Sequence, residues 1–351
     1  MREALARERF PHGVILTGPA GAGKYTLAVM MAQAMNCLTP PTPANGLPAF
    51  CGTCSNCTRI GLAADLDTRF AEAVEAREAL RDADKKETRI LIQTHPDVLI
   101  IPPDPPQMLV KVDQVRRVIA NIYYRPAEAK ERVYIFTTSA FMKEAANSLL
   151  KILEEPPEFA TLFLLAENPG ALLPTIRSRC VTFTLAPLEN SAIEQDLAKL
   201  RPDWTPAQRA LVARLSGGAV GRARGFDLAA YTAARANALA VLASALEGND
   251  HSALFKITET YRAGADGRDK TEYLLRTLYS LLEDLLWLLE GTPELVRNTD
   301  IARDLGKLAQ SASFAWVQDA SNRLSEVERG MRRNLLRSLS LDAFATSLEQ
   351  A

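Results

Sequence analysis

The sequence predicts a two-part architecture: an α/β fold with a mainly parallel sheet, followed by an all-helical second half. Three observations support this prediction. Short apolar runs alternate with helical patterns up to Pro187, as a parallel sheet with helices on both faces requires. A glycine-rich loop follows the first apolar run. From Ala229 the sequence is rich in alanine and leucine at helical spacing.

Five strands and three intervening helices are expected before Pro187. The expected strands are Gly13–Thr17, Asp97–Ile101, Arg132–Phe136, Thr161–Leu165 and Val181–Leu185. The expected helices are Lys24–Asn36, Val112–Tyr123 and Lys143–Glu154. The charged stretch Arg69–Arg89 has few large apolar residues, and we expect it to be an exposed helix or a flexible excursion.

The glycine-rich loop has the pattern of a phosphate-binding P-loop. Its candidate ligand-binding residues are Gly18, Gly21, Gly23 and Lys24, which would direct backbone N–H groups and an ammonium at a nucleotide's phosphates. The next residue should carry a hydroxyl for Mg²⁺, but it is Tyr25. Thr26 is also a candidate, although it lies about 100° further round the helix.

A second metal-binding element is missing from the strand that ends at Phe136. A working NTPase carries a carboxylate after this strand, but here Thr137, Thr138 and Ser139 follow, with no acid before Glu144. We therefore expect poor hydrolysis, while binding of ATP or ADP without cleavage stays open.

Composition and charge restrict the class of protein. The chain has 351 residues, enough for two or three domains, and its 41 basic and 42 acidic residues nearly cancel. Overall charge therefore favours no polyanionic partner. The first residues are charged, and the apolar stretch Tyr273–Leu289 contains Arg276, Glu283 and Asp284. We expect a cytoplasmic protein without a membrane partner.

Four of the five cysteines predict a structural zinc site. They are Cys37, Cys51, Cys54 and Cys57, within a module of residues 37–57. Short Cys-x2-Cys steps allow thiolates to converge on one ion, and a loop rich in proline and glycine can return the distant fourth ligand. Disulfides are disfavoured in a cytoplasmic protein. An iron–sulfur cluster and metal-free core cysteines are the competing interpretations.

Several motifs resemble those of the bacterial clamp-loader AAA+ family. Ser178-Arg179-Cys180 is similar to the family's Ser-Arg-Cys motif, and the segment Asn147–Pro157 is similar to its "NALLKxLEEPP" block. His95-Pro96-Asp97, the four-cysteine module and the sensor-2-like turn that contains Arg222 match in the same order. The resemblance is strong over residues 10–230 and rests only on length and helical character beyond them.

The resemblance implies a three-domain architecture. Residues 1–187 would form an AAA+ nucleotide-binding-like domain with the inserted zinc module, residues 188–228 a helical lid, and residues 229–351 an all-α oligomerisation domain of the collar type. Arg222 would contribute to the degenerate nucleotide site.

The missing metal ligands decide which role within the family the sequence favours. The loss of both metal ligands is similar to that in delta-prime subunits, which do not hydrolyse ATP. Gamma-type ATPases, by contrast, carry both ligands. Arg179 would then act in trans on a neighbouring ATP site as an arginine finger. The implied partners are gamma/tau and delta subunits in a pentamer of DNA polymerase III, the sliding clamp, and primer–template DNA.

Two other functions stay open at this point. One is an active gamma-like ATPase with unorthodox metal ligands, since Lys24 is present. The other is a zinc-bearing nucleic-acid binding module, since a locally basic stretch contains Arg323, Arg329, Arg332, Arg333 and Arg337. Interleaved leucines suggest instead that this stretch is one face of a packed helix.

Overall fold

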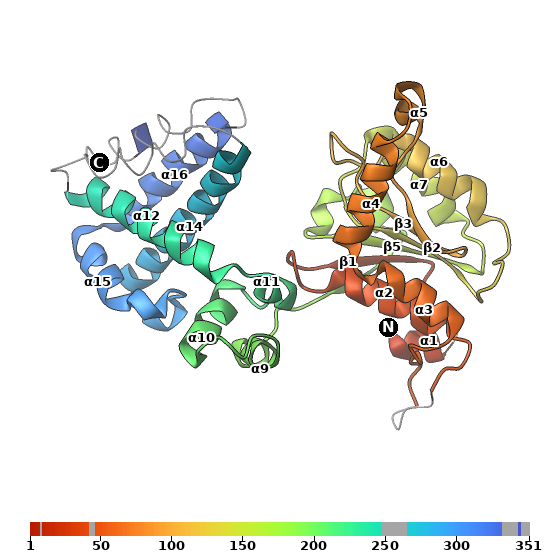
Figure 1. Ribbon diagram of the computed structural model, residues 1–351, viewed down its shortest axis with the longest axis horizontal. Coiled ribbons are helices and arrows are strands. Elements are labelled where there is room, and N and C mark those ends of the chain that lie inside the picture. Colours follow the sequence, from red (N-terminus) through yellow and green to blue (C-terminus); the bar gives the residue numbers. More distant parts are fainter. Residues whose placement is uncertain (8, 42–45, 248–264, 332–342, 345–351) are drawn as a thin grey trace. The chain divides into compact units, whose positions relative to one another are not determined.

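The chain forms two compact units (Figure 1). The computed structural model describes residues 1–7, 9–41, 46–247, 265–331 and 343–344. One unit comprises Met1–Pro187 and Ala219–Gly221, and the other comprises Leu188–Gly218 and Arg222–Ala351. The basic positions Arg332, Arg333 and Arg337 lie outside the described residues.

A six-stranded sheet forms the centre of the first unit. In pairing order its strands are β2 (Ile92–His95), β3 (Val98–Ile101), β4 (Arg132–Phe136), β5 (Ala160–Ala166), β1 (Gly13–Thr17) and β6 (Val181–Thr184). The five parallel strands are those expected from the sequence. β2 pairs antiparallel to β3 and was not expected, because its residues Ile-Gln-Thr-His do not form an apolar run.

Helices cover both faces of this sheet (Figure 1). The helices of the first unit are α1 (Arg2–Ala6), α2 (Lys24–Asn36), α3 (Ser55–Gly61), α4 (Leu66–Glu78), α5 (Asp82–Glu87), α6 (Val112–Ile122), α7 (Lys143–Glu154) and α8 (Pro174–Arg177), with the 3-10 turns η1 (Leu62–Ala64) and η2 (Pro169–Ala171). Successive strand residues point to opposite faces. On β1, Ile15 packs with α6 and α7, whereas Val14 and Leu16 pack with α2.

The charged stretch between the cysteine module and β2 folds into α4 and α5. α4 has no fully buried residue, which confirms the exposed-helix interpretation. It is nevertheless attached to the first unit, because Leu66, Phe70 and Ala73 pack against the apolar cluster around α2. The carboxylate of Asp65 caps α4 by accepting a hydrogen bond from the backbone N–H of Thr68 at 3.1 Å.

The helices after Pro187 form two apolar clusters. They are α9 (Asn190–Leu200), α10 (Pro206–Leu215), α11 (Val220–Arg224), α12 (Leu228–Glu247), α14 (Ala265–Leu289), α15 (Ala302–Ser311) and α16 (Phe314–Met331), with the 3-10 turns η3 (Pro293–Leu295) and η4 (Thr299–Ile301). Asp284 of α14 is buried, and its carboxylate is satisfied by hydrogen bonds from the backbone of Arg297 and from Asn298. None of the helices described here has the length and apolar character needed to cross a bilayer.

Asp97, between β2 and β3, holds the loop that precedes β4. Its fully buried carboxylate accepts hydrogen bonds from the backbone N–H groups of Ala127, Glu128 and Ala129 at 2.8–2.9 Å. Burial alone would raise the pKa of Asp97, but these hydrogen bonds and Arg132, 3.7 Å away, outweigh it and lower the pKa.

Asp97→Asn should reduce the free energy of unfolding by about 2–3 kcal/mol at pH 7, because an amide replaces a charged acceptor of several N–H groups. The pKa of Asp97 is lower in the folded state, so the carboxylate's contribution is complete above its unfolded pKa of about 3.9 and is lost as the pH falls through the folded pKa. Urea unfolding at pH 7 and in acid measures this loss of stability. Asp82→Asn, at a side chain that is 98% exposed, is the control. A loss that is equal at pH 7 and in acid would contradict the assignment.

Candidate functional site

The loop between β1 and α2 has the backbone of a phosphate-binding loop. Gly18, Gly21 and Gly23 have φ angles of 146°, 78° and 87°, which side chains rarely adopt. A Cβ atom at Gly18 would also lie 2.8 Å from the carbonyl oxygen of Leu185. Gly23 is the N-cap of α2, so the positive end of that helix faces the space beside the loop.

Lys24 folds back onto this loop. Its Nζ donates hydrogen bonds to the carbonyl oxygens of Gly18 at 2.7 Å and Pro19 at 2.8 Å. Burial lowers the pKa of Lys24, and the nearby charge of Glu167 partly opposes that shift. A phosphate that used Lys24 would have to replace these two carbonyl contacts.

A cavity of about 840 Å³ lies beside the loop, at the carboxyl ends of the central strands. Its lining combines residues of the loop and α2 with residues that follow β4 and β5 and with the start of α4: Ala20, Gly21, Gly23, Lys24, Tyr25, Thr26, Leu66, Asp67, Thr137, Thr138, Ser139, Leu165, Glu167, Asn168, Ala171 and Gly221. Thr26, a predicted binding residue, is exposed in this cavity. Arg222, also predicted, is an exposed residue of α11.

Two acidic residues in the cavity were not predicted from the sequence. Glu167 directly follows β5, and its position at the carboxyl end of a parallel strand could have indicated it. Asp67 belongs to α4, and only the packing of this helix brings it to the cavity. In the part of the chain that the structure describes, the one cluster of three or more potential metal ligands is the four cysteines. The cavity therefore contains no such cluster of carboxylates.

Tyr25 occupies the position where a metal-binding hydroxyl would be expected, and its own hydroxyl is engaged elsewhere. The phenol donates a hydrogen bond to the carbonyl oxygen of Ala63, a buried residue of η1. Burial raises the pKa of Tyr25 well above its usual range, so the side chain stays neutral. Tyr25 therefore links the start of α2 to the segment that follows the cysteine module.

The four predicted cysteines converge on one point. Their Sγ atoms all lie within 4.8 Å of one another, and those of Cys51 and Cys57 are 4.0 Å apart. A tetrahedral zinc site with bonds of about 2.3 Å places sulfurs roughly 3.8 Å apart, so one ion suits this cluster. Backbone N–H groups of Cys51 and Cys54 donate to neighbouring sulfurs at 3.3 Å. Hydrogen bonds from the Thr39 hydroxyl, and from the backbone of Cys54 and Thr53, lower the pKa of Cys51 to about 5.

The cysteine module is joined to the sheet by buried amide groups. Asn56, between Cys54 and Cys57, donates to the carbonyl oxygen of Asn36 at 3.0 Å and lies 3.1 Å from Nε2 of His95. Asn36 in turn accepts hydrogen bonds from the backbone N–H groups that precede β4. His95 and Asp97 of the predicted His-Pro-Asp motif therefore have structural contacts with this module and with the loop before β4.

Arg179 lies on the turn between α8 and β6. Its Nη1 donates to the carbonyl oxygen of Thr175 at 2.9 Å and to Oγ of Ser178 at 3.3 Å, while Nη2 lies 2.6 Å from Oε1 of Glu154. The next residue, Cys180, is partly buried and packs against the core cluster that includes Leu153 of α7. The turn is thus anchored on one side while the arginine side chain remains 34% exposed.

The register of the sheet separates Arg179 from the phosphate-binding loop. β6 pairs with β1 in parallel, with Val181 opposite Val14 and Thr184 opposite Thr17. Arg179 precedes the amino end of β6, whereas the loop follows the carboxyl end of β1. The paired stretch of four residues separates these ends by about 10 Å. Arg179 is not among the described residues that line the cavity.

The N-terminal half of the chain, which contains this sheet, matches a known protein family. The family described as "DNA polymerase III, delta subunit" matches residues 1–189, which is more than half of the 351 residues. The chain belongs to this family. It is thereby a member of the clamp-loader AAA+ proteins, as the sequence motifs predicted.

Relatives of this DNA polymerase III family include several named subunits. The delta' subunit of Pseudomonas aeruginosa is 30% identical over 214 residues, which cover 60% of this chain and 54% of the relative. The delta' subunit of Bacillus subtilis is 28% identical, with 61% and 53% covered. The tau subunit of Escherichia coli is 26% identical over 285 residues, with 81% and 34% covered. The matched region thus spans about half of the delta' relatives and a third of tau.

One similar solved structure is a DNA polymerase III gamma subunit-related protein of Thermotoga maritima. It is 18% identical, and the alignment covers 99% of this chain and 98% of that one, with a TM-score of 0.38. A TM-score this low adds nothing to the family assignment.

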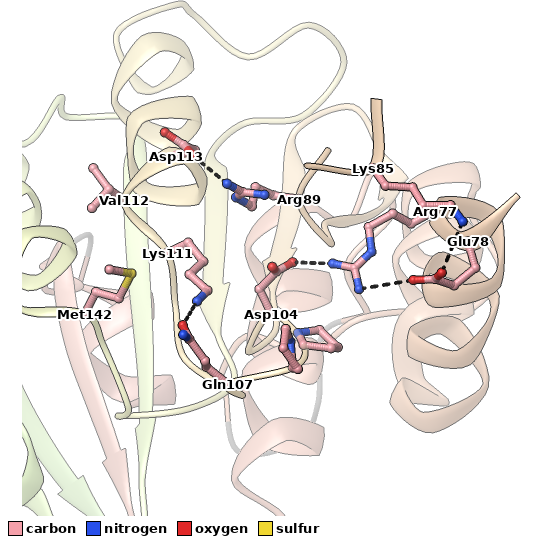
Figure 2. A pocket seen from close by; sticks show the side chains of 12 residues that line it. Arg77, Glu78, Lys85, Arg89, Asp104, Gln107, Lys111, Val112, Asp113 and Met142 are labelled. Carbon is pink, nitrogen blue, oxygen red and sulfur yellow. Dashed lines mark hydrogen bonds and ion pairs between the residues drawn. The ribbon is translucent and has the colours of Figure 1, made fainter. Parts of the chain in front are cut away.

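A second cavity, of about 520 Å³, lies where α4 and α5 meet the start of α6 (Figure 2). Four basic side chains line it, and each has a polar partner. Arg77 pairs with the buried Asp104 at 3.2 Å, and Arg89 pairs with Asp113 at 3.1 Å. Lys85 lies near two acids, and Lys111 contacts the Gln107 amide. The ion pairs of Arg77 and Arg89 attach the charged stretch to the rest of the α/β unit.

Proposed function

We propose that this chain is a non-hydrolysing clamp-loader subunit of the delta-prime type, which supplies Arg179 to the ATP site of a neighbouring subunit. The observation that carries the proposal is the separation of Arg179 from the chain's own phosphate-binding loop by the length of the paired strands. Its family membership and its relatives among delta' and tau subunits support the assignment to clamp loading in DNA replication.

Three features of the cavity argue against hydrolysis at the chain's own loop. The position that should bind Mg²⁺ through a hydroxyl is Tyr25, whose phenol is bonded to Ala63. β4 is followed by Thr137 and Thr138, which offer no negative charge to a metal. Lys24 is engaged with backbone carbonyls. ATP or ADP held by the loop glycines, Lys24 and Thr26 would therefore stay uncleaved.

The position of Arg179 suits action in trans. An arginine finger must contact the phosphoryl group that is transferred, because it stabilises charge on that group in the transition state. Arg179 lies at the amino end of β6, beside α8, with a partly exposed guanidinium. A neighbouring subunit whose nucleotide faced this edge would receive the arginine.

The remaining parts of the chain are assigned by the same proposal. Residues 188–228 act as a lid and residues 229–351 as a collar that assembles with gamma/tau and delta subunits into a pentamer. The complex loads the sliding clamp on primer–template DNA, in the cytoplasm. Zinc held by the four cysteines has a structural role, because no described residue of the module belongs to an apolar core cluster.

The isolated chain should have no appreciable ATPase activity, far below the roughly one turnover per second of ordinary enzymes. Tyr25→Thr should not create activity, because the acids after β4 are still missing. Phosphate release measures turnover, and calorimetric titration with ATP measures binding separately. Turnover that Lys24→Ala abolishes would support a gamma-like ATPase instead.

Arg179→Ala should lower ATP hydrolysis by the reconstituted complex while leaving its assembly unchanged. An arginine finger contributes on the order of 10³-fold at its own site, but other ATP sites of the complex would keep the total decrease smaller. Arg179→Lys should restore little, because an ammonium lacks the planar fork of a guanidinium. Arg177→Ala, an exposed arginine two residues away, is the control. Equal rates for Arg179→Ala and Arg177→Ala would remove Arg179 from the mechanism.

The purified protein should contain one zinc ion per chain. Cys57→Ser should reduce the zinc content and the melting temperature, because metal binding contributes to folding of the module. Cys180→Ser, which changes a cysteine outside the cluster, should retain the metal. Elemental analysis checks both variants. Iron with sulfide, or no metal after purification under reducing conditions, would contradict the zinc assignment.

A further inference from the structure

We propose that Glu154 is a positioning residue that holds Arg179 in a parked conformation, from which a neighbouring subunit's nucleotide releases it. This inference rests on the proposed trans action of Arg179. It adds a regulatory role for Glu154, the last residue of α7. Hydrolysis at the neighbouring subunit's ATP site would then depend on displacement of the Glu154 carboxylate from Arg179.

The geometry shows that both ends of the guanidinium are engaged within the chain. Nη2 lies 2.6 Å from the Glu154 carboxylate, and Nη1 donates to the Thr175 carbonyl oxygen and to the Ser178 hydroxyl. A charge-assisted contact of this length is among the stronger side-chain hydrogen bonds. An arginine that is neutralised in this way offers less charge to a transferring phosphoryl group.

The placement of Glu154 in its helix supports a role beyond the helix itself. It is the last residue of α7, where the negative end of the helix dipole disfavours a carboxylate. Arg179 compensates for this unfavourable position. The adjacent Glu155 also lies at the end of α7 and is exposed. It therefore provides a natural comparison, with the same charge one residue away.

The net stabilisation by the Arg179–Glu154 pair is small enough for the arginine to exchange partners. Both side chains are partly exposed, 34% for Arg179 and 50% for Glu154, and exposed ion pairs shift an equilibrium by about twofold to fivefold. A nucleoside triphosphate carries more negative charge than one carboxylate and would compete successfully for the guanidinium at close range. Glu154 therefore restrains the arginine without blocking it.

The test uses the reconstituted complex with Glu154→Gln in this chain. Glutamine keeps the size and an acceptor oxygen but loses the charge, so the partner's kcat should rise about twofold to fivefold at unchanged KM. Glu155→Gln should have no effect, and Glu154→Asp should return the rate toward wild type. In an Arg179→Ala background, Glu154→Gln should change nothing. Raised salt should shrink the difference between wild type and Glu154→Gln, because salt screens exposed pairs.

The outcomes separate this inference from the proposed function. If Arg179→Ala lowers hydrolysis but Glu154→Gln leaves kcat unchanged or lowers it, the parked conformation is wrong and trans action stands. If Arg179→Ala has no effect, the proposed function itself fails. The pair is also visible without partners, since Glu154→Gln in the isolated chain should speed rotation of the Arg179 guanidinium in ¹⁵N NMR spectra. Unchanged guanidinium signals would show that the pair does not form in solution.

Discussion

The parallel pairing of β6 with β1 fixes where the two proposed functional elements of this chain lie. The phosphate-binding loop follows the carboxyl end of β1, and Arg179 precedes the amino end of β6, so four paired residues separate them. Arg179 is also absent from the described residues that line the cavity beside the loop. Under the proposed function, nucleotide contact and arginine donation therefore belong to different ATP sites of an assembly.

The cysteine module is coupled to this sheet by buried polar contacts. Asn56 links the module to α2 and to His95, and Tyr25 links the start of α2 to the turn after the module. A buried amide or phenol that loses its partner destabilises the fold, so these contacts hold module and loop together. Tyr25 thus has a structural use at the very position where an ATPase needs a metal ligand.

Local features were predictable from the sequence, and non-local contacts were not. The bounds of β1, α2 and α7 follow from apolar runs, glycines and prolines that act within a few residues. The cysteine spacing likewise predicted a cluster that the structure brings together. The contact of Arg179 with Glu154 joins residues 25 positions apart, and the approach of α4 to the cavity depends on a few apolar side chains in a charged stretch. Neither contact leaves a periodic signal in the sequence.

The central proposal is that this chain contributes to ATP hydrolysis through Arg179, before the amino end of β6, and not through its own phosphate-binding loop. The most direct measurement is steady-state ATP hydrolysis by a complex in which only this chain carries Lys24→Ala. Lys24 contacts its own loop, and Arg179 is unchanged in this variant. The rate should therefore equal that of the wild-type complex. A decrease as large as that caused by loss of Arg179 would show that the chain's own loop takes part in hydrolysis, and would contradict the claim.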